Sequence, residues 1–390
     1  MPTLEPQVPR LNLDRRRFIV LAGSTAAYVA LRPHLAWAKK AARGLPAIQP
    51  WEIPAAAPHD PVELTRALIG AAVLAPSTWN TQPWRFEVDG DRIRIVADAR
   101  RSLPVIDPGQ KSMMISLGAA LENMLVTARA YGLRPTVTYF PYGPGNPAVA
   151  EVTWTHGDAR RDRALFQAIP ERRTNRREYD GRGIFPQNRA QLLAQIPEDF
   201  RMHWIDDREA MHALGNIARD AAEARVLDHR AEAEQMTWMR FGEDDAVRRG
   251  DGVTVDALEY GGPARWLAGR YFHPESWFLR FGAQAAGKRA RGGFRSAGAI
   301  ALLTALRGDE NSRLVGGQVY ERFALKATQL GIAHHPVNEP IDIERFRPEV
   351  LRRFSATGEE PLMLVRLGHA KRPEASMRRS VAYVASFRNS

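Results

Sequence analysis

The segment Ala75-Pro76-Ser77-Thr78-Trp79-Asn80-Thr81-Gln82-Pro83-Trp84 joins a stretch with helical spacing to a stretch that alternates like a strand. Pro76 should stop the helix, because its ring removes a backbone donor and clashes with the preceding turn. The loop that follows carries hydroxyl and amide groups on Ser77, Thr78, Asn80 and Gln82. Such groups donate and accept hydrogen bonds, which suits the polar edge of a heterocycle. The alternative is a helix-ending turn that buries a tryptophan.

The flanking sequence predicts a mixture of helices and strands. Asp60 and Pro61 are typical of the cap and first position of a helix, and apolar residues follow at helical spacing. Asp89-Gly90 is a tight hairpin signal. The elements expected on the two sides of this hairpin and beyond it are strands at 84–88 and 92–97, a long helix at 112–131 ended by Gly132, and strands at 136–140 and 149–154.

The first 38 residues have the order of an export signal. Arg15, Arg16 and Arg17 precede Phe18 and an apolar run to residue 31, and Ala36-Trp37-Ala38 provides a small-x-small cleavage site. The paired arginines resemble the twin-arginine (Tat) signal. We therefore expect residues 1–38 to be removed after passage through the twin-arginine translocase to the periplasm, and 39–59 to be an irregular lead-in. A retained basic amphipathic anchor is the alternative; the apolar run is too short for a membrane span.

Composition narrows the class of protein. The 390 residues suit two domains, and the absence of cysteine excludes disulfides and thiolate metal sites. The net charge is +11, but the arginines are interspersed with acidic residues and form no basic stripe with aromatics, which argues against nucleic-acid binding. His334 and His335 are adjacent on an expected strand and so should face opposite ways, which argues against a shared metal ion.

The second half of the chain partly repeats the first. Three residues and a following apolar position recur 199 positions later in the same order: Gly118, Ala128, Gly132 and Leu133 match Gly317, Ala327, Gly331 and Ile332. Both segments are expected to be helices with small residues on one face, which lets two helices approach closely. Two related halves, 60–165 and 166–390, would place these helices in one chain. The alternative is that two helices ending in Gly are alike by chance.

Two motifs resemble the nitroreductase family. The loop from Pro76 to Trp84 is similar to the family's flavin-contacting Pro-Ser-x-x-Asn-x-Gln-Pro-Trp pattern. The run Arg172-Arg173-Thr174-Asn175-Arg176-Arg177 resembles the Arg-Arg-Ser-x-Arg run that grips the flavin phosphate, and guanidinium groups do bind phosphate oxygens bidentately. A solvated charge cluster is the alternative. Family homodimers share each flavin between subunits, so one motif in each half implies a single FMN site.

The resemblance implies further cofactor contacts. The tail resembles the family's strand-Gly-x-x-x-x-Pro-x-x-x-x-Arg-Arg pattern, with an expected strand at 361–367, and makes Arg378 and Arg379 candidates for the phosphate. An apolar run at 300–306 is expected to be a helix, preceded by backbone N–H groups near Ser296 and Gly298 that would face the flavin. The complete expected set is Ser77, Thr78, Asn80, Gln82, Arg172, Arg173, Thr174, Arg176, Ser296, Gly298, Arg378 and Arg379. No catalytic side chain is expected, since the flavin carries the chemistry.

An aromatic-rich insertion at about 222–291 interrupts the second half. We expect extra helices with their own small core, or a lid over the flavin or over the vacated second site. Apart from this insertion, the resemblance covers residues 60 to 390 and is strongest to the Acg-like subgroup of exported or stress-linked relatives.

As a whole, the resemblance implies an α+β nitroreductase-like fold, in which two fused related halves form an intramolecular pseudo-dimer, so that the protein acts as a monomer. It implies an FMN-dependent oxidoreductase that transfers electrons or hydride from a small-molecule donor to a quinone or nitroaromatic acceptor. The alternative is a flavin-sequestering protein in which a lid occludes the FMN.

Overall fold

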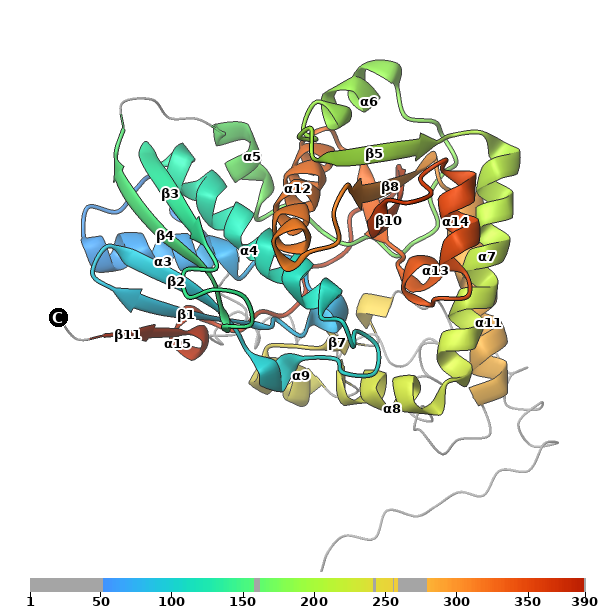
Figure 1. The fold of residues 1–390 in the computed structure, drawn as a ribbon, viewed down its shortest axis with the longest axis horizontal. Helices are drawn as coiled ribbons and strands as arrows, with labels where there is room; N and C mark the ends of the chain where they lie inside the picture. Colours follow the sequence, from blue (N-terminus) through green and yellow to red (C-terminus); the bar gives the residue numbers. More distant parts are fainter. Residues whose placement is uncertain (1–51, 158–161, 241–242, 255, 259–278, 389–390) are drawn as a thin grey trace, which may run out of the picture.

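The computed structural model describes residues 52–157, 162–240, 243–254, 256–258 and 279–388 (Figure 1). The expected export signal, with Arg15, Arg16, Arg17 and Phe18, lies outside the described residues, as does most of the expected lead-in. Among the described residues, no helix combines the length and the apolar character that a bilayer crossing requires. The chain is α+β, as predicted.

The first sheet forms around the hairpin that the sequence predicts. Helix α3 (Pro61–Ala72) begins at Asp60, whose side chain accepts a hydrogen bond from Glu63 N at 2.9 Å. Gly90, with φ of 60°, makes the hairpin turn between the first two strands. Helix α4 (Lys111–Ala130) ends before Gly132, which has φ of 82°. The strands are β1 (Trp84–Asp89), β2 (Arg92–Ala97), β3 (Leu133–Tyr139) and β4 (Ala148–His156).

The second sheet corrects one prediction. Residues 300–306, expected as a helix, are largely strand β8 (Ala299–Ala305), which pairs on both sides with β5 (Phe200–Ile205) and β10 (Glu360–Gly368). Every residue of β8 is buried, because α12 (Glu310–Gln329) covers one face of the sheet and α7 (Arg208–Leu227) with α11 (Leu279–Arg295) covers the other. A strand buried on both faces has a continuous apolar sequence, which periodicity cannot distinguish from a buried helix.

The two sheets share one topology. Their strand orders are β1-β2-β4-β3 and β5-β8-β10-β9, where β9 is Ala333–Pro336, and neighbouring strands are antiparallel at every corresponding position. In each half, one long helix separates the second strand from the third: α4 in the first and α12 in the second. The C-terminal strand β11 (Ala385–Phe387) is the exception, since it pairs parallel to β1 and so joins the sheet of the first half.

The long helices α4 and α12 lie side by side between the two sheets (Figure 1). A Cβ atom added at Gly118 would overlap the backbone oxygen of Leu314, and one added at Gly317 would overlap the backbone oxygen of Ile115. Leu314 follows Ile115 by 199 positions, the offset that also separates the two glycines. The contact is therefore reciprocal, as in a two-fold interface, and the prediction that these helices approach closely is confirmed.

The connection between β5 and β8 holds the insertion that the sequence predicts. In the first half, a tight turn joins the corresponding strands β1 and β2. In the second half, the connection runs through α7 and later α11, and these two helices pack against each other. The described elements between them are α8 (His229–Thr237), the parallel strands β6 (Met239–Arg240) and β7 (Val253–Thr254), α9 (Glu243–Arg249) and the short η6 (Asp256–Leu258). The segment around β7 lies against the loop after α3.

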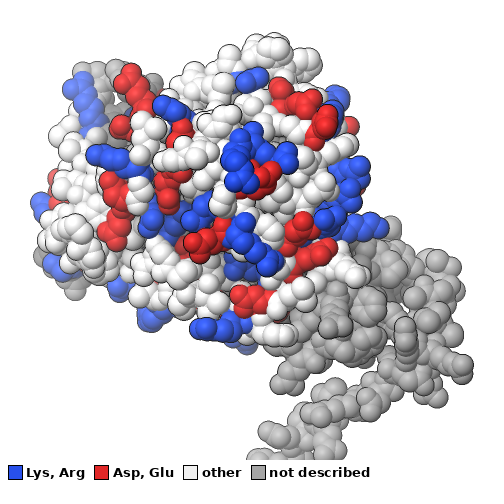
Figure 2. Space-filling model, turned by 45° about the vertical axis from the view of Figure 1, so that its right-hand side comes forward, with Lys and Arg blue, Asp and Glu red and all other residues white. Residues whose placement is uncertain are grey.

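The remaining elements are short. They are η4 (Thr78–Asn80), η5 (Ala99–Arg101), α5 (Arg163–Ala168), α6 (Pro186–Leu193), α13 (Glu339–Asp342), α14 (Arg347–Arg353) and α15 (Val381–Val384). On the face drawn in Figure 2, basic and acidic side chains are intermingled. The excess positive charge therefore forms no single-sign stripe on this face.

Changing Gly118 or Gly317 to Ala should lower the stability of the whole chain. The added methyl group would overlap backbone atoms, which cannot move aside as a side chain can. Overpacking of this kind lowers the free energy of unfolding by about 1–3 kcal/mol. Gly70→Ala is the matched control, because a Cβ there has no neighbour within 4 Å and Ala favours the α3 helix. Thermal unfolding followed by circular dichroism measures the difference. If the Gly118→Ala and Gly317→Ala proteins unfold at the same temperature as the wild type, the close contact between α4 and α12 is contradicted.

Candidate functional site

The loop after α3 has an unusual backbone. Trp79, Asn80 and Gln82 have φ values of 52°, 53° and 50°, in the left-handed region that residues other than glycine seldom adopt. Each such conformation costs on the order of 1–3 kcal/mol and persists only where the surroundings enforce it. Ser77 closes the loop, because its Oγ accepts a hydrogen bond from Gln82 N at 2.9 Å.

Two amide side chains tie this loop to the insertion. Asn80 donates from Nδ2 to the Gly252 oxygen at 2.9 Å and to the Met377 oxygen at 3.1 Å, and its backbone oxygen accepts from Gly252 N. Gln82 donates from Nε2 to the Gly250 oxygen at 2.8 Å. Both amides are buried, so these bonds fix the loop geometry.

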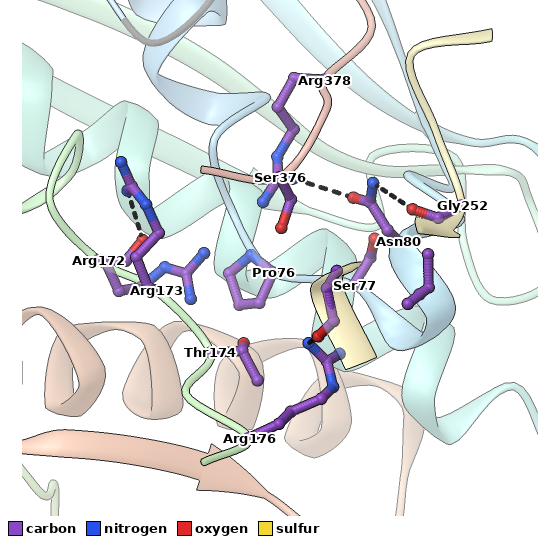
Figure 3. A pocket seen from close by; sticks show the side chains of 12 residues that line it. Pro76, Ser77, Asn80, Arg172, Arg173, Thr174, Arg176, Gly252, Ser376 and Arg378 are labelled. Carbon is purple, nitrogen blue, oxygen red and sulfur yellow. Dashed lines mark hydrogen bonds between the residues drawn. The ribbon is translucent and has the colours of Figure 1, made fainter. Parts of the chain in front are cut away.

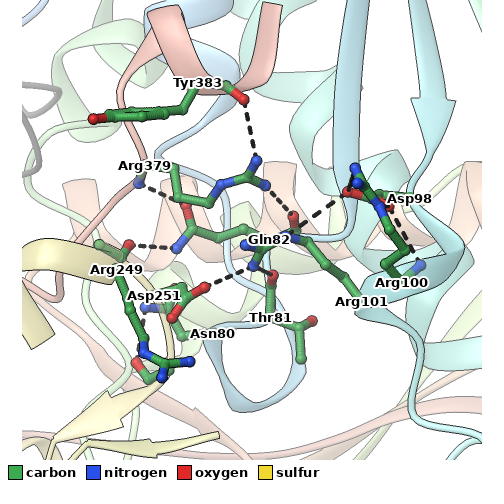
Figure 4. A network of polar contacts seen from close by, with 12 residues as sticks. Asn80, Thr81, Gln82, Asp98, Arg100, Arg101, Arg249, Asp251, Arg379 and Tyr383 are labelled. Carbon is green, nitrogen blue, oxygen red and sulfur yellow. Dashed lines mark hydrogen bonds and ion pairs between the residues drawn. The ribbon is translucent and has the colours of Figure 1, made fainter. Parts of the chain in front are cut away.

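Asp251 strengthens the same junction (Figure 4). Its carboxylate accepts from Arg101 Nη1 at 2.8 Å and from Arg240 Nη2 at 2.6 Å. Arg101 also donates to the Thr81 oxygen at 2.7 Å, so one guanidinium group joins the loop to the insertion. The insertion therefore forms part of the wall around the loop.

A cavity of about 40 Å³ opens beside the loop (Figure 3). It brings together seven of the residues that the sequence singles out: Ser77, Asn80, Arg172, Arg173, Thr174, Arg176 and Arg378. Residues from three distant parts of the chain thus meet at one place. The other lining residues are Pro76, Gly252, Val253, Ala257 and Ser376.

Two of the arginines are anchored on the carbonyl groups just beyond α3. Arg378 donates to the Leu74 and Ala75 oxygens at 3.3 and 3.2 Å, and to Asn80 Oδ1 at 3.0 Å. Arg172 donates to the same Leu74 oxygen at 3.3 Å. Cations are favoured at the carboxyl end of a helix, so α3 helps to gather positive charge here.

The arginine cluster consists of Arg172, Arg173, Arg176 and Arg378, which line the first cavity. It holds more positive than negative charge. Burial and then the charge of Arg172 lower the pKa of Arg378 to about 9 and the pKa of Arg173 to about 10. The buried Glu321 carboxylate lies 3.3 Å from Arg172 Nε, and burial raises the pKa of Glu321 to about 7 although Arg172 opposes the shift. Glu374 partly offsets the effect on Arg173. Such a cluster favours a bound anion.

Two nitrogens of Arg172, Nε and Nη1, make no hydrogen bond to the described residues, and Nε lies 3.3 Å from the Glu321 carboxylate. Arg172 is 2% exposed, and its Nη1 is buried without a hydrogen bond in this part of the chain. Buried donors are nearly always satisfied, and each exception calls for an explanation. An anion in the cavity that Arg172 lines would supply the acceptor.

A second cavity, of about 200 Å³, shares Pro76, Ser77, Thr174 and Arg176 with the first. Thr78 lines the second cavity, so that eight of the predicted residues lie at the two cavities. One wall is largely apolar and includes Trp79, Ile106, Ile115, Ala119, Tyr320, Pro336 and Met363. The polar and charged residues of the lining are Ser112, Ser116, Arg225, Gln235, His335, Asn338, Glu339 and Asp342. A planar ring with polar edges is the kind of molecule that such a lining suits.

Four predicted residues lie elsewhere. Gln82 and Arg379 hold the scaffold: Arg379 N donates to Gln82 Oε1 at 2.9 Å, and Arg379 Nη2 donates to the Tyr383 oxygen at 3.1 Å (Figure 4). Ser296 Oγ accepts from Tyr179 N at 3.1 Å. Gly298 N donates to the Leu367 oxygen at 2.8 Å, at the start of β8. None of the four lines either cavity.

Sequence reasoning missed two groups of lining residues. The insertion contributes Gly252 and Val253, which no local motif connects to a loop more than 160 positions away. The turn after β9 contributes Asn338 and Glu339. A signal was present there, since Pro336 ends a short strand that follows a Gly turn, and turns after sheet strands commonly carry functional groups.

The chain is similar to several proteins named as nitroreductases, although no family model matches it. "Putative NAD(P)H nitroreductase Rv3131" of Mycobacterium tuberculosis is 28% identical over 310 residues, which cover 79% of this chain and 86% of the relative. "Probable NAD(P)H nitroreductase PigM" of a Serratia species is 26% identical over 234 residues, covering 54% and 62%.

Among solved structures, the FMN-dependent nitroreductase NfnB of Mycobacterium smegmatis in complex with NADPH matches 58% of this chain and 98% of its own. The TM-score is 0.36 and the identity 16%, a likeness too low to carry a conclusion. The sequence relatives are more informative. Over most of its length, the chain is similar to proteins named NAD(P)H nitroreductases.

Proposed function

We propose that this protein is an FMN-binding oxidoreductase of the nitroreductase type. It would take electrons from a small-molecule donor and pass them to a small acceptor of the quinone or nitroaromatic class. The names of its relatives support an enzyme that uses NAD(P)H. The arginine cluster beside the loop after α3 is the observation that carries the proposal.

The residues around the first cavity fit a phosphate monoester. Arg172, Arg173 and Arg378 supply guanidinium groups, and Thr174 adds a hydroxyl group. The buried Nη1 of Arg172 makes no hydrogen bond within the described chain, and a phosphate oxygen would satisfy it. Charge-assisted bonds of this kind are roughly twice as strong as neutral ones. The small volume of this cavity suits the phosphate group alone.

The second cavity would hold the ring system and, beside it, the acceptor, because the cavity adjoins the first and shares Ser77 and Thr174 with it. FMN, when bound, supplies the redox chemistry. The protein binds and orients it through hydroxyl groups of Ser77 and Thr78 on a loop whose left-handed residues are locked by buried amides. The apolar wall excludes water from the ring. No side chain is assigned a covalent role.

A single site per chain follows from the asymmetry between the halves. The first half carries the Pro76–Trp84 loop and the second carries the arginine run, and each motif occurs once. The shared strand order and the reciprocal glycine contact support an intramolecular pseudo-dimer with one complete site. Such a chain needs no second copy, so we expect a monomer.

One observation favours the alternative, a flavin-sequestering protein. Gly252, Val253 and Ala257 of the insertion line the first cavity, and Arg225 and Gln235 line the second. The insertion thus contributes to the lining of both cavities and would act as a lid. An enzyme must admit donor and acceptor past this cover, whereas a storage protein need not. Bleaching of the bound flavin by NAD(P)H, followed by recovery on adding a quinone, would favour the enzyme.

The protein purified with its cofactor should hold one FMN per chain, since only one loop and one arginine run are present. Denaturation releases the flavin, and its absorbance against protein concentration gives the ratio. Two flavins per chain would contradict the loss of the second site. Protein that takes up no flavin would contradict the proposed function itself.

Arg173→Ala should weaken FMN binding roughly ten- to a hundredfold, because one charge-assisted hydrogen bond contributes about 1.5–3 kcal/mol. Riboflavin lacks the phosphate and should bind both proteins nearly equally. Arg379→Ala is the matched control, since Arg379 is a neighbouring arginine turned toward Gln82 and Tyr383. Titration of the apoprotein with each ligand measures the affinities. Equal losses for FMN and riboflavin would point to a folding effect instead.

We also propose export by the twin-arginine translocase, on the strength of Arg15, Arg16, Arg17 and the apolar run after Phe18. Changing all three arginines to Lys should leave precursor in the cytoplasm, because this route reads paired guanidinium groups. Arg10→Lys is the control for a charge-preserving change nearby. Fractionation with immunoblotting measures the precursor, and normal export of the triple variant would refute the assignment.

A further inference from the structure

His335 lies in the second cavity beside an arginine that is held rigidly. In the pairing of β9 with β10, His335 is opposite Arg366, and Arg366 Nε donates to His335 Nδ1 at 3.0 Å. Arg366 is 2% exposed and lies over the Tyr179 ring, 4.3 Å from its centre. It also donates from Nη2 to the Asn175 oxygen at 3.2 Å. The guanidinium group therefore has one fixed position.

This contact determines where the imidazole carries its proton. A guanidinium group only donates hydrogen bonds, so His335 Nδ1 must present its lone pair. Burial, followed by the charges of Arg366, Arg176 and Arg289 and by His334, holds the pKa of His335 well below its usual range. A neutral imidazole that accepts at Nδ1 carries its proton on Nε2.

The Nε2–H group is available to a ligand. His335 lines the second cavity, and the only hydrogen bond it makes to the described residues is the one at Nδ1. Its neighbour His334 is buried and does not line the cavity, and its Nδ1 lies 3.4 Å from the Tyr320 hydroxyl. Trp79, Ile115 and Met363 line the same cavity, and their side chains suit an aromatic ring.

We propose that His335 is a specificity-determining residue, a neutral hydrogen-bond donor of fixed tautomer that selects aromatic acceptors bearing an oxygen, such as a quinone carbonyl or a nitro group. The acceptor chemistry rests on the proposed function, whereas the tautomer does not. A site built to donate a hydrogen bond rejects an analogue that lacks the acceptor, because the buried donor is then left unpaired. Arg366 acts through His335 as a positioning residue.

Binding of menadione and of 2-methylnaphthalene, its hydrocarbon counterpart, tests the donor. The chain has no cysteine, so no thiol competes for the quinone. His335→Leu should weaken menadione binding to the FMN-loaded protein roughly three- to tenfold, the effect of losing one neutral hydrogen bond, and should leave 2-methylnaphthalene unchanged. His335→Gln should restore most of the loss, since its amide can accept from Arg366 and donate to the ligand. Titration calorimetry measures both ligands.

Equal changes for the two ligands, or an unchanged affinity for menadione in His335→Leu, would overturn the proposal. The flavin content of the wild type is measured first and reports on the proposed function separately. If the protein takes up no FMN, the same titrations on the apoprotein still test His335.

The tautomer has its own readout in the ligand-free protein. Long-range proton–nitrogen NMR correlations distinguish the two imidazole tautomers, and the signal of His335 is the one lost in His335→Gln. We expect the Nε2–H form without titration from about pH 6 to 8, a range in which an ordinary histidine would gain charge. A proton on Nδ1, or titration within this range, would overturn the assignment.

Discussion

The structure depends on the backbone contact between α4 and α12. Helices meet this closely only where side chains are missing, and Gly118 and Gly317 provide the two gaps that the Leu314 and Ile115 oxygens fill. The sheets are thereby fixed on opposite sides of one helix pair (Figure 1). Because the main chain defines this interface, side chains at the ends of the helices remain available to line cavities, as Ile115 does.

The site is electrostatically tied to the same interface. Glu321 lies on α12 one turn after Gly317 and is the buried carboxylate nearest to Arg172. A buried ion pair is weak evidence for stability, since desolvation offsets much of the attraction. The ion pair with Glu321 instead fixes the position of the Arg172 side chain. It holds Arg172 against the Leu74 oxygen just beyond α3, in a cavity that Arg378 also lines. The anion-binding character of the cavity therefore depends on how the two halves pack.

Short sequence patterns predict much of this fold, but they do not predict which distant parts of the chain meet. The cap at Asp60, the turn at Gly90 and the small faces of the two long helices are each encoded within a few residues. Strand β8 escapes such reasoning because burial on both faces removes its period, and Ser296 and Gly298, which were expected beside the flavin, line neither cavity. Residue type alone did not show which polar side chains line a cavity. It also did not show which ones, like Gln82, form hydrogen bonds that hold the loop in place. Nor did it show that Gly252 would close the site from the insertion.

Strand β11 gives the chain an order of assembly. It is synthesised about 300 residues after β1, with which it pairs. Arg378 lies a few residues before it, so the first sheet and the arginine cluster are completed by the same terminal segment. A chain that has not yet been synthesised to this segment therefore lacks Arg378 from the cavity and the partner of β1 from the first sheet. Closing so long a loop also adds a slow, non-local step to folding.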